Sequence, residues 1–223
     1  MACRTSAPVV ACASVPAALV VMAKEPVPGR TKTRLCPPLR HAQAAALAQA
    51  ALADTLAAVA DAQTAGRRVL VLEGRPGDWL APGFELIAQR GGCLAERLSN
   101  AVVDVGEALL LLGMDTPQLT GALLDQALER LGGDGVDAVL GPSDDGGYWT
   151  IGLDTPDPRV FEGVPMSAAT TGAAQRTRLV ALGLRVADLC ALRDVDSYED
   201  VAAVAALAPR SCFAAAAARL RLP

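Results

Sequence analysis

The sequence is poor in residues that several classes of protein require. Aromatic residues make up 3% of its 223 residues, so base stacking is a weak candidate for ligand recognition. The single histidine, His41, leaves little for a Ser-His-Asp or Cys-His mechanism. Six cysteines are present and none forms a C-x-x-C pair, which argues against a Cys/His zinc site and favours reduced thiols.

Basic charge and long apolar runs are also scarce. The formal net charge is -4, and no basic stripe runs along the chain, so we expect no nucleic-acid partner. No stretch reaches the roughly 20 uninterrupted apolar residues of a membrane-spanning helix, so we expect no membrane association. Hydrophobic residues make up 52%, enough for a sizeable core. We expect a cytoplasmic protein with a flexible N-terminal tail at residues 1–16 and one domain at 17–223.

A basic loop near the N-terminus is the most informative motif. It follows an apolar run at 17–23, which indicates a buried strand, and it precedes an Ala/Leu-rich helical stretch. Glycine lets backbone approach a ligand, and ammonium and guanidinium groups neutralise phosphate oxygens. The loop therefore predicts a nucleotide phosphate chain as its ligand. Its candidate phosphate-binding residues are Lys24, Gly29, Arg30, Lys32 and Arg34.

Apolar runs alternate with helical patterns along the rest of the chain. This order predicts an α/β fold with a mostly parallel central sheet and helices on both faces. The Ala-rich C-terminal helix is a candidate surface for a homodimer. Strands are expected at 17–23, 68–72, 84–88, 108–113, 136–140, 148–153 and 184–189. Helices are expected at 41–65, 93–106, 168–182, 197–207 and 212–221, with one more beginning after Thr120 and ending at Gly132.

Three acidic clusters follow predicted strands or stand in turns. Asp115 comes after the strand at 108–113, where an open α/β sheet places its site. Asp145 stands before two glycines, which by themselves indicate a tight turn. Asp196 or Ser197 is the expected N-cap of the next helix. Beside a phosphate-binding loop, such carboxylates suggest a bound Mg²⁺ or Mn²⁺ that would offset charge on a leaving phosphate.

Four segments resemble one known family. They are "AKEPVPGRTKTRL", "GMDTPQLT", "GPSDDGGYWTIGL" and "DVDSYEDV". They look like the blocks of the bacterial radical-SAM/selenodomain-associated (arsenosugar-type) transferases, which belong with the nucleotide-diphospho-sugar transferases of GT-A fold. The resemblance runs in the same order over residues 17–206. It implies a single-domain GT-A fold.

The resemblance also implies roles for individual residues. Asp115 matches the aspartate near the metal and diphosphate of that fold, and Asp196 matches a second metal-binding aspartate. Asp145 is the candidate general base, and Lys32 is a catalytic candidate as well as part of the phosphate-binding loop. The sugar or acceptor side would be lined by Gly146, Gly147 and Tyr148.

Three functions remain open from the sequence. The first is a metal-dependent glycosyltransferase that uses a nucleotide-diphosphate-sugar donor and a small-molecule acceptor. The second is a nucleotidyltransferase that joins a nucleoside triphosphate to a phosphorylated small molecule and releases pyrophosphate; the charge density of the basic loop favours this one. The third is a nucleotide-binding protein without catalysis. The resemblance tips the balance slightly to glycosyl transfer.

Overall fold

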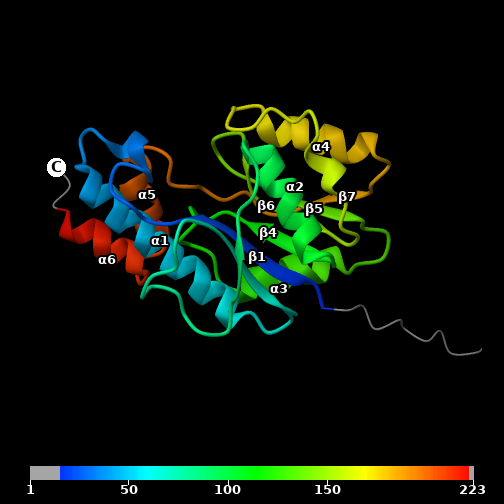
Figure 1. Cartoon of the computed structure of the whole chain (residues 1–223), viewed down its shortest axis with the longest axis horizontal. Coiled ribbons are helices and arrows are strands. Elements are labelled where there is room, and N and C mark those ends of the chain that lie inside the picture. The colour runs from blue at the N-terminus through cyan, green and yellow to red at the C-terminus, as the bar shows by residue number, and fades with distance from the viewer. Residues whose placement is uncertain (1–15, 221–223) are drawn as a thin grey trace, which may run out of the picture.

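Seven strands form one sheet at the centre of the molecule (Figure 1). The computed structural model describes residues 16–220, so the predicted tail at 1–16 lies outside the described residues except for Pro16. The strand order is β3-β2-β1-β4-β6-β5-β7, and β6 alone among these strands runs antiparallel to its neighbours. The predicted mostly parallel α/β sheet is confirmed. The strands are β1 Ala18–Lys24, β2 Arg68–Glu73, β3 Glu85–Ala88, β4 Leu109–Leu112, β5 Ala138–Pro142, β6 Tyr148–Leu153 and β7 Val186–Asp188.

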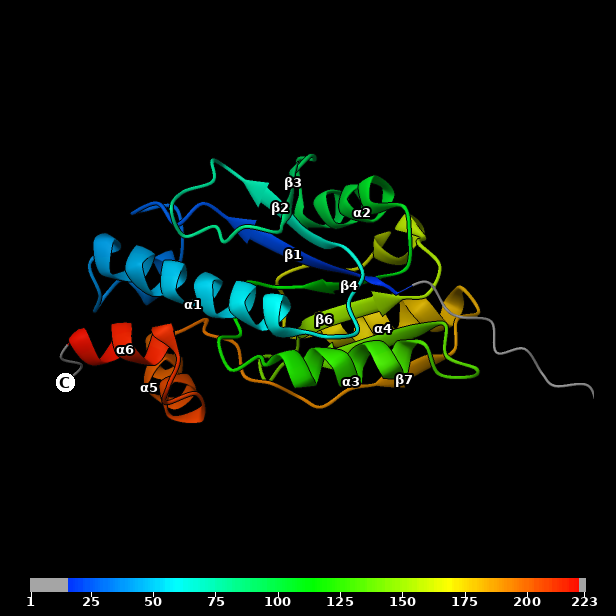
Figure 2. The ribbon, with the colours of Figure 1, turned by 90° about the horizontal axis from the view of Figure 1, so that it is seen from below.

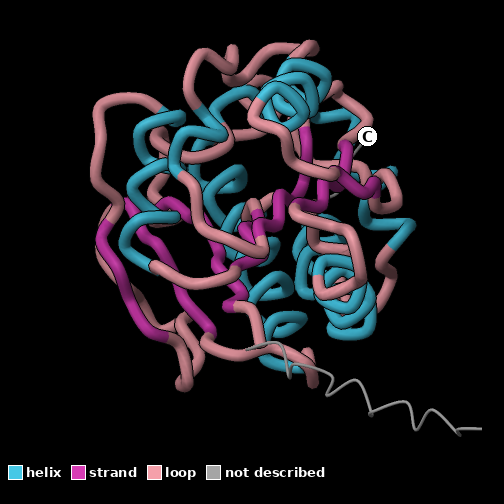
Figure 3. Tube along the Cα trace, turned by 90° about the vertical axis from the view of Figure 1, so that its right-hand side faces the viewer, coloured by secondary structure: helices cyan, strands magenta, loops and turns pink. Residues whose placement is uncertain are grey.

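Helices cover both faces of the sheet, as Figures 2 and 3 show. On one face, Leu56 of α1 and Leu124 of α3 are buried against the strands. On the other face, Leu98 of α2 and Leu179 of α4 are buried in a second cluster. The sheet is therefore the middle of three layers. The helices are α1 His41–Asp61, α2 Leu94–Val105, α3 Gly121–Leu131, α4 Thr171–Ala181, α5 Tyr198–Leu207 and α6 Cys212–Arg219, with 3-10 turns η1 Thr33–Leu35 and η2 Pro158–Phe161.

The last two helices pack on the part of α1 that extends beyond the sheet (Figure 1). Phe213 of α6 and Val204 of α5 are buried against Leu47 of α1. Asp54 of α1 accepts hydrogen bonds of 2.8 Å from the backbone N–H groups of Cys212 and Phe213. Those two donors belong to the first turn of α6 and have no partner inside the helix, so Asp54 fixes where α6 begins.

Local capping signals set several helix boundaries. Thr120 accepts from the N–H of Leu123 at the start of α3, and Ser197 forms a capping box with Asp200 at the start of α5. Both starts agree with the sequence prediction.

Two predicted helix boundaries differ from the structure by three residues or more, and in each case a side chain explains the difference. Helix α1 ends at Asp61 rather than near residue 65, because the N–H groups of Gln63 and Thr64 donate to Asp125 of α3 instead of continuing the helix. Helix α4 begins at Thr171 rather than 168, because the Thr171 hydroxyl bonds Ala168 N and Pro165 O and holds the preceding residues in a turn.

Helix α1 has the length and apolar composition of a membrane span. In the fold, 56% of its most apolar stretch is buried, and the core helices of soluble proteins share this length and composition. The apolar stripe of Leu52, Leu56 and Val59 is fully buried against the sheet. The stripe is thus accounted for by packing within the fold.

The connections of the sheet define one crevice. From β1 the chain crosses to β2 on one side, whereas β4 lies on the other side of β1. Open α/β sheets bind ligands at such a switch point, outside the carboxyl ends of the strands. The basic loop follows β1 and Asp115 follows β4, so both predicted site segments lie at this edge of the sheet.

Candidate active site

A cleft of about 740 Å³ opens at the carboxyl edge of the sheet, a size typical of small-molecule sites. Its walls come from the basic loop, the segment after β4, the turn between β5 and β6, residues 166–171, the start of α2, and residues 194–196. Segments from across the chain therefore converge on one space. The charged side chains that line it are Lys24, Arg30, Lys32, Arg34, Arg97, Asp115, Asp145, Asp194 and Asp196.

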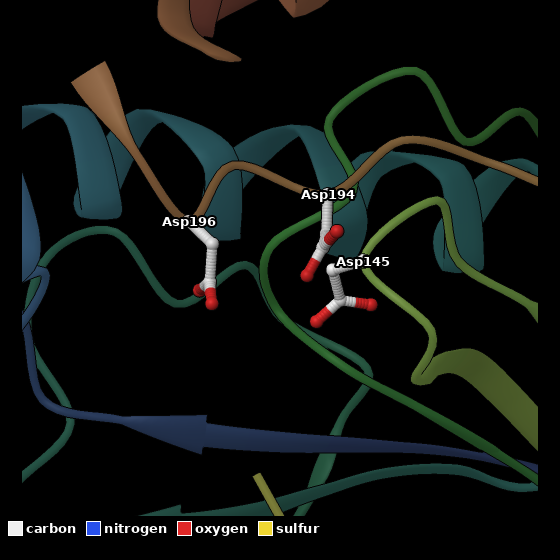
Figure 4. A group of neighbouring side chains, drawn as sticks. All are labelled: Asp145, Asp194 and Asp196. Atoms are coloured by element: carbon white, nitrogen blue, oxygen red, sulfur yellow. The ribbon is translucent and has the colours of Figure 1, made fainter. Parts of the chain in front are cut away.

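Three carboxylates meet in this cleft (Figure 4). One carboxylate oxygen from each of Asp145, Asp194 and Asp196 lies within 4.8 Å of the others. The segment after β7 brings them together. Its Leu192 N donates to Pro142 O at 3.1 Å, so this segment runs beside the end of β5. Three hard oxygen donors at this spacing are the kind of group that Mg²⁺ or Mn²⁺ takes as ligands.

Asp194 is the member of this group that the sequence prediction missed. It stands two residues before Asp196, with buried Val195 between them. In an extended segment, side chains two residues apart lie on the same side, so the Asp-Val-Asp pattern was the available signal. The N-cap interpretation of Asp196 and Ser197 obscured it.

The Asp194 carboxyl group is electrostatically strained. Its pKa is raised to about 6, first by burial and then by the negative charges of Asp145 and Asp196. Neighbouring carboxylates disfavour one another's ionisation, and an added positive charge would relieve this repulsion. The arrangement therefore favours a cation among the three side chains.

Asp145 is held by its own turn. Its Oδ1 accepts from the hydroxyl of Ser143 at 2.7 Å and from Gly147 N at 2.8 Å. Its Oδ2 accepts no hydrogen bond from the residues that the structure describes. One oxygen is thus fixed, and the other is open to a proton or a cation. The role of Asp145 as a general base stays a prediction, and Oδ2 is the oxygen that would take the proton.

The two glycines after Asp145 have different roles: Gly147 lines the cleft, and Gly146 lets the turn pack closely against the segment before α4. Gly146 has φ +86°, and a Cβ there would lie 2.0 Å from Ala169 O. Gly147 lines the cleft, whereas Gly146 lies behind it against the segment before α4. Gly172 N donates to Gly146 O at 2.8 Å. The Asp145 turn is therefore clamped to the wall formed by residues 166–171.

Lys32 is a buried cation in this site, with 8% of its side chain exposed. Its Nζ lies 2.9 Å from Asp115 Oδ2 and 3.6 Å from Asp196 Oδ1, and it also donates to Val195 O. Its backbone is left-handed, with φ 52°, an unusual conformation for a residue with a Cβ. Lys32 therefore links two acidic segments, which limits its freedom to reach a phosphate.

Asp115 has one satisfied and one orphaned oxygen. Its Oδ2 pairs with Lys32, whereas Oδ1 is buried and has no hydrogen-bond partner among the described residues. An unpartnered buried carboxylate oxygen is costly, and a cation in the cleft would satisfy it. Asp115 O accepts from Val195 N at 3.1 Å, which ties this segment to the carboxylate group.

The other predicted site residues divide between the cleft and its supports. Arg34 lines the cleft, with Nη1 2.7 Å from Asp196 Oδ2. Tyr148 lines it too, and its hydroxyl donates to Gln175 Oε1 at 3.3 Å. Burial raises the pKa of Tyr148. Gly29, with φ +79°, shapes the basic loop and is not among the lining residues. Arg97 was not predicted and lines the cleft from α2.

The fold is that of the nucleotide-diphospho-sugar transferases. A crystal structure from Desulfovibrio desulfuricans G20, provisionally assigned as a nucleotide-diphospho-sugar transferase, is similar with a TM-score of 0.75 and 27% identity. The similarity covers 91% of this chain and 97% of that one. The chain belongs to a family described as "uncharacterized protein conserved in bacteria" (DUF2064), whose profile matches residues 39–168.

Two more distant structures share the fold. The 2-C-methyl-D-erythritol 4-phosphate cytidylyltransferase of Thermus thermophilus matches with a TM-score of 0.54 and 16% identity, covering 87% of this chain and 99% of that one. A CMP:2-keto-3-deoxy-manno-octonic acid synthetase complexed with CTP matches with a TM-score of 0.52 and 13% identity, over 87% and 99%. In a sequence comparison with curated proteins, no match was found.

Proposed function

We propose that this protein is a metal-dependent glycosyltransferase that takes a nucleotide-diphosphate-sugar donor and transfers its sugar to a small-molecule acceptor. The observation that carries the proposal is the group Asp145, Asp194 and Asp196, which faces the basic loop across one cleft at the switch point of the sheet. The likeness to the provisionally assigned nucleotide-diphospho-sugar transferase supports this choice, as does the resemblance to the radical-SAM/selenodomain-associated transferases.

The charge of the cleft suits a diphosphate donor. Among the residues that the structure describes, five cationic and four acidic side chains line it, so the formal net charge of this lining is small. Lys32 and Arg34 pair with Asp196, which removes much of the positive charge that the loop carries in the sequence. A triphosphate bears more negative charge than a diphosphate ester, and this cleft offers little excess charge to bind it without added cations.

The residues present fit a divalent cation. Asp194 and Asp196, with the orphaned Oδ1 of Asp115 nearby in the same cleft, would hold Mg²⁺ or Mn²⁺. When bound, the ion would stabilise negative charge on the departing nucleoside diphosphate. The cations of the basic loop would bind the remaining phosphate oxygens.

Asp145 would act on the acceptor. Its Oδ1 is held by Ser143 and Gly147, so its open Oδ2 has a defined position in the cleft. We propose that Oδ2 takes the proton from the acceptor hydroxyl as the acceptor oxygen attacks the sugar carbon. The acceptor would lie beside Gly147 and the Tyr148 ring, against the wall at 166–171.

Nucleotidyl transfer is the second candidate, and one observation favours it. Lys24, Arg30 and Arg34 keep 54%, 66% and 68% of their side chains exposed, so they could reach a further phosphate. That reaction would consume a nucleoside triphosphate and release pyrophosphate. The small net charge of the cleft argues the other way.

A ligand and product screen separates these functions. The folded protein would be melted with Mg²⁺ or Mn²⁺ and each nucleoside triphosphate, UDP-sugar and GDP-sugar, because a ligand that binds only the folded state raises the melting temperature. We expect stabilisation by a nucleotide sugar and release of nucleoside diphosphate. Stabilisation by one triphosphate, with pyrophosphate released once a phosphorylated acceptor is added, would replace our proposal by nucleotidyl transfer. Binding without any product would leave a nucleotide-binding protein.

A pair of variants tests the role of Asp145. Asp145→Asn should lower kcat by roughly 100-fold or more, the range for a lost general base, a larger effect than its change in donor affinity. Asp144→Asn is the matched control, because the neighbouring Asp144 is exposed and lies outside the carboxylate group. Equal kcat for Asp145→Asn and the wild type would remove Asp145 from the chemistry.

A further inference from the structure

Three cations from separate elements meet at one carboxylate beside the cleft. Lys24, at the end of β1, places Nζ 3.4 Å from Glu73 Oε2, and Arg30, in the basic loop, places Nη2 3.8 Å from Glu73 Oε1. Arg97, in the first turn of α2, donates to the same Glu73 Oε2. We call these four residues the Glu73 cluster.

The Glu73 cluster holds the positive excess of the cleft. It contains three cations and one acid, whereas Lys32 and Arg34 lie against Asp115 and Asp196. The cations nearby hold the pKa of the Glu73 carboxyl below its usual range even though its partial burial acts in the opposite direction. An anionic ligand in the cleft would therefore find its most favourable potential at this cluster.

Arg97 is placed to present that charge to a ligand. Arg97 lines the cleft, whereas Glu73 is not among the lining residues. Its Nε donates to Gly91 O at 3.2 Å and its Nη1 to Glu73. Its Nη2 donates to none of the described residues. A guanidinium with one edge anchored and hydrogens left over is preorganised to bind phosphate oxygens.

The position of Arg97 is unfavourable for the helix alone. Helix α2 begins at Leu94, so Arg97 lies in its first turn, where the partial positive charge of the helix N-terminus repels a cation. Glu73 offsets part of this repulsion. Arg97 thus has a position in which binding a negative ligand relieves the repulsion.

We propose that Arg97 is a phosphate-binding residue of this cleft, held by Glu73 beside Lys24 and Arg30, and that the three cations bind the diphosphate of the nucleotide donor. The identity of the ligand rests on the proposed function. The anion site itself rests on the geometry of the Glu73 cluster. Because Arg97 is on α2, its contribution comes from outside the basic loop.

Calorimetric titration of the full chain tests the proposal with three probes in Mg²⁺: inorganic pyrophosphate, UDP or GDP (whichever binds the wild type more tightly), and the matching nucleoside. Arg97→Ala should weaken pyrophosphate and the nucleoside diphosphate by roughly 10- to 100-fold, the range for a lost charge-assisted hydrogen bond. Nucleoside affinity should change by less than about twofold, and Arg97→Lys should recover part of the loss.

Arg90→Ala is the matched control. Arg90 also forms an ion pair with a residue of α2, Asp104, but does not line the cleft. The Arg90→Ala variant should bind all three probes like the wild type, and melting curves should show that both alanine variants are folded. Pyrophosphate affinity of Arg97→Ala within about twofold of the wild type would overturn the proposal, as would an equal loss of nucleoside affinity.

The same titrations, together with the product screen described above, separate this inference from the proposed function. If Arg97→Ala loses pyrophosphate affinity while the wild type releases no nucleoside diphosphate from any nucleotide sugar, the anion site stands and glycosyl transfer fails. If the wild type itself does not bind pyrophosphate or either nucleoside diphosphate, the anion site is wrong.

Discussion

Asp194→Asn should make the metal-free protein more stable at neutral pH, although it removes a carboxylate from the cleft. The pKa of Asp194 is raised from 3.8 to about 6 by burial and by repulsion from Asp145 and Asp196. The unfolded chain ionises the same group near its ordinary pKa. Ionised Asp194 therefore costs the folded state free energy at neutral pH, and asparagine removes that cost.

The size and sign of the effect follow from this shift. Two pKa units correspond to about 3 kcal/mol, and partial exposure of Asp194 reduces this to about 1–2 kcal/mol through solvent screening. The folded state holds the Asp194 proton to a higher pH than the unfolded chain does. The protonated Asp194 therefore favours the folded state at low pH, and the protein loses this stability as the pH rises from about 4 to about 6. At about pH 7.5 the variant should melt about 2–8 °C higher than the wild type. Near pH 3 the two should nearly coincide, because Asp194 is then mostly protonated in both states.

Thermal melts in EDTA across this pH range measure the difference. Asp144→Asn is the control, since Asp144 is exposed and should show no comparable gain. Adding Mg²⁺ should raise the melting temperature of the wild type by mass action and that of Asp194→Asn much less. A variant that melts at or below the wild-type temperature at neutral pH without metal would refute the proposed electrostatic strain.

Three other substitutions test separate parts of the structure. Lys32→Met should lower the free energy of unfolding by about 1–3 kcal/mol in urea melts, because it leaves the partly buried Asp115 carboxylate without its cation, while Asp196 keeps Arg34; unchanged stability would mean that the pairing contributes nothing. Gly146→Ala should cost about 2 kcal/mol or more, since φ is +86° and its Cβ would meet Ala169 O; a wild-type melting curve would contradict this packing. Cys93→Ser should keep full turnover, because Cys93 is an exposed N-cap residue outside the cleft lining; an inactive variant would point to covalent chemistry at the thiol.

The secondary structure was largely predictable because its signals are local. The run at 109–112 is apolar throughout, and the structure buries it on both faces as β4. Thr120 and Ser197 mark the starts of α3 and α5 by capping, which acts within one turn. The wrong ends depend on distant partners. Asp125 terminates α1 from another helix, and no local pattern near residue 65 indicates that.

The site was predictable where chemistry follows a strand and not where it depends on tertiary contacts. Asp115 and the basic loop could be placed at the carboxyl edge because each follows a predicted strand. The buried pairing of Lys32 with Asp115 joins segments about 80 residues apart, so its partial neutralisation could not be seen. Glu73 and Arg97 lie on β2 and α2 and meet only in the fold. From the sequence, the positive charge of the site was expected on the basic loop alone. In the structure, the excess positive charge lies at the Glu73 cluster, which includes Arg97 of α2.

The most direct test is a crystal structure of the protein with Mn²⁺ and the nucleoside diphosphate that binds most tightly, using the anomalous signal to locate the metal. We expect Mn²⁺ bound by the carboxylates of Asp194 and Asp196, with the diphosphate between the ion and the cations Lys24, Arg30 and Arg97. A metal bound away from these carboxylates, or a diphosphate bound outside the cleft, would contradict the proposed site.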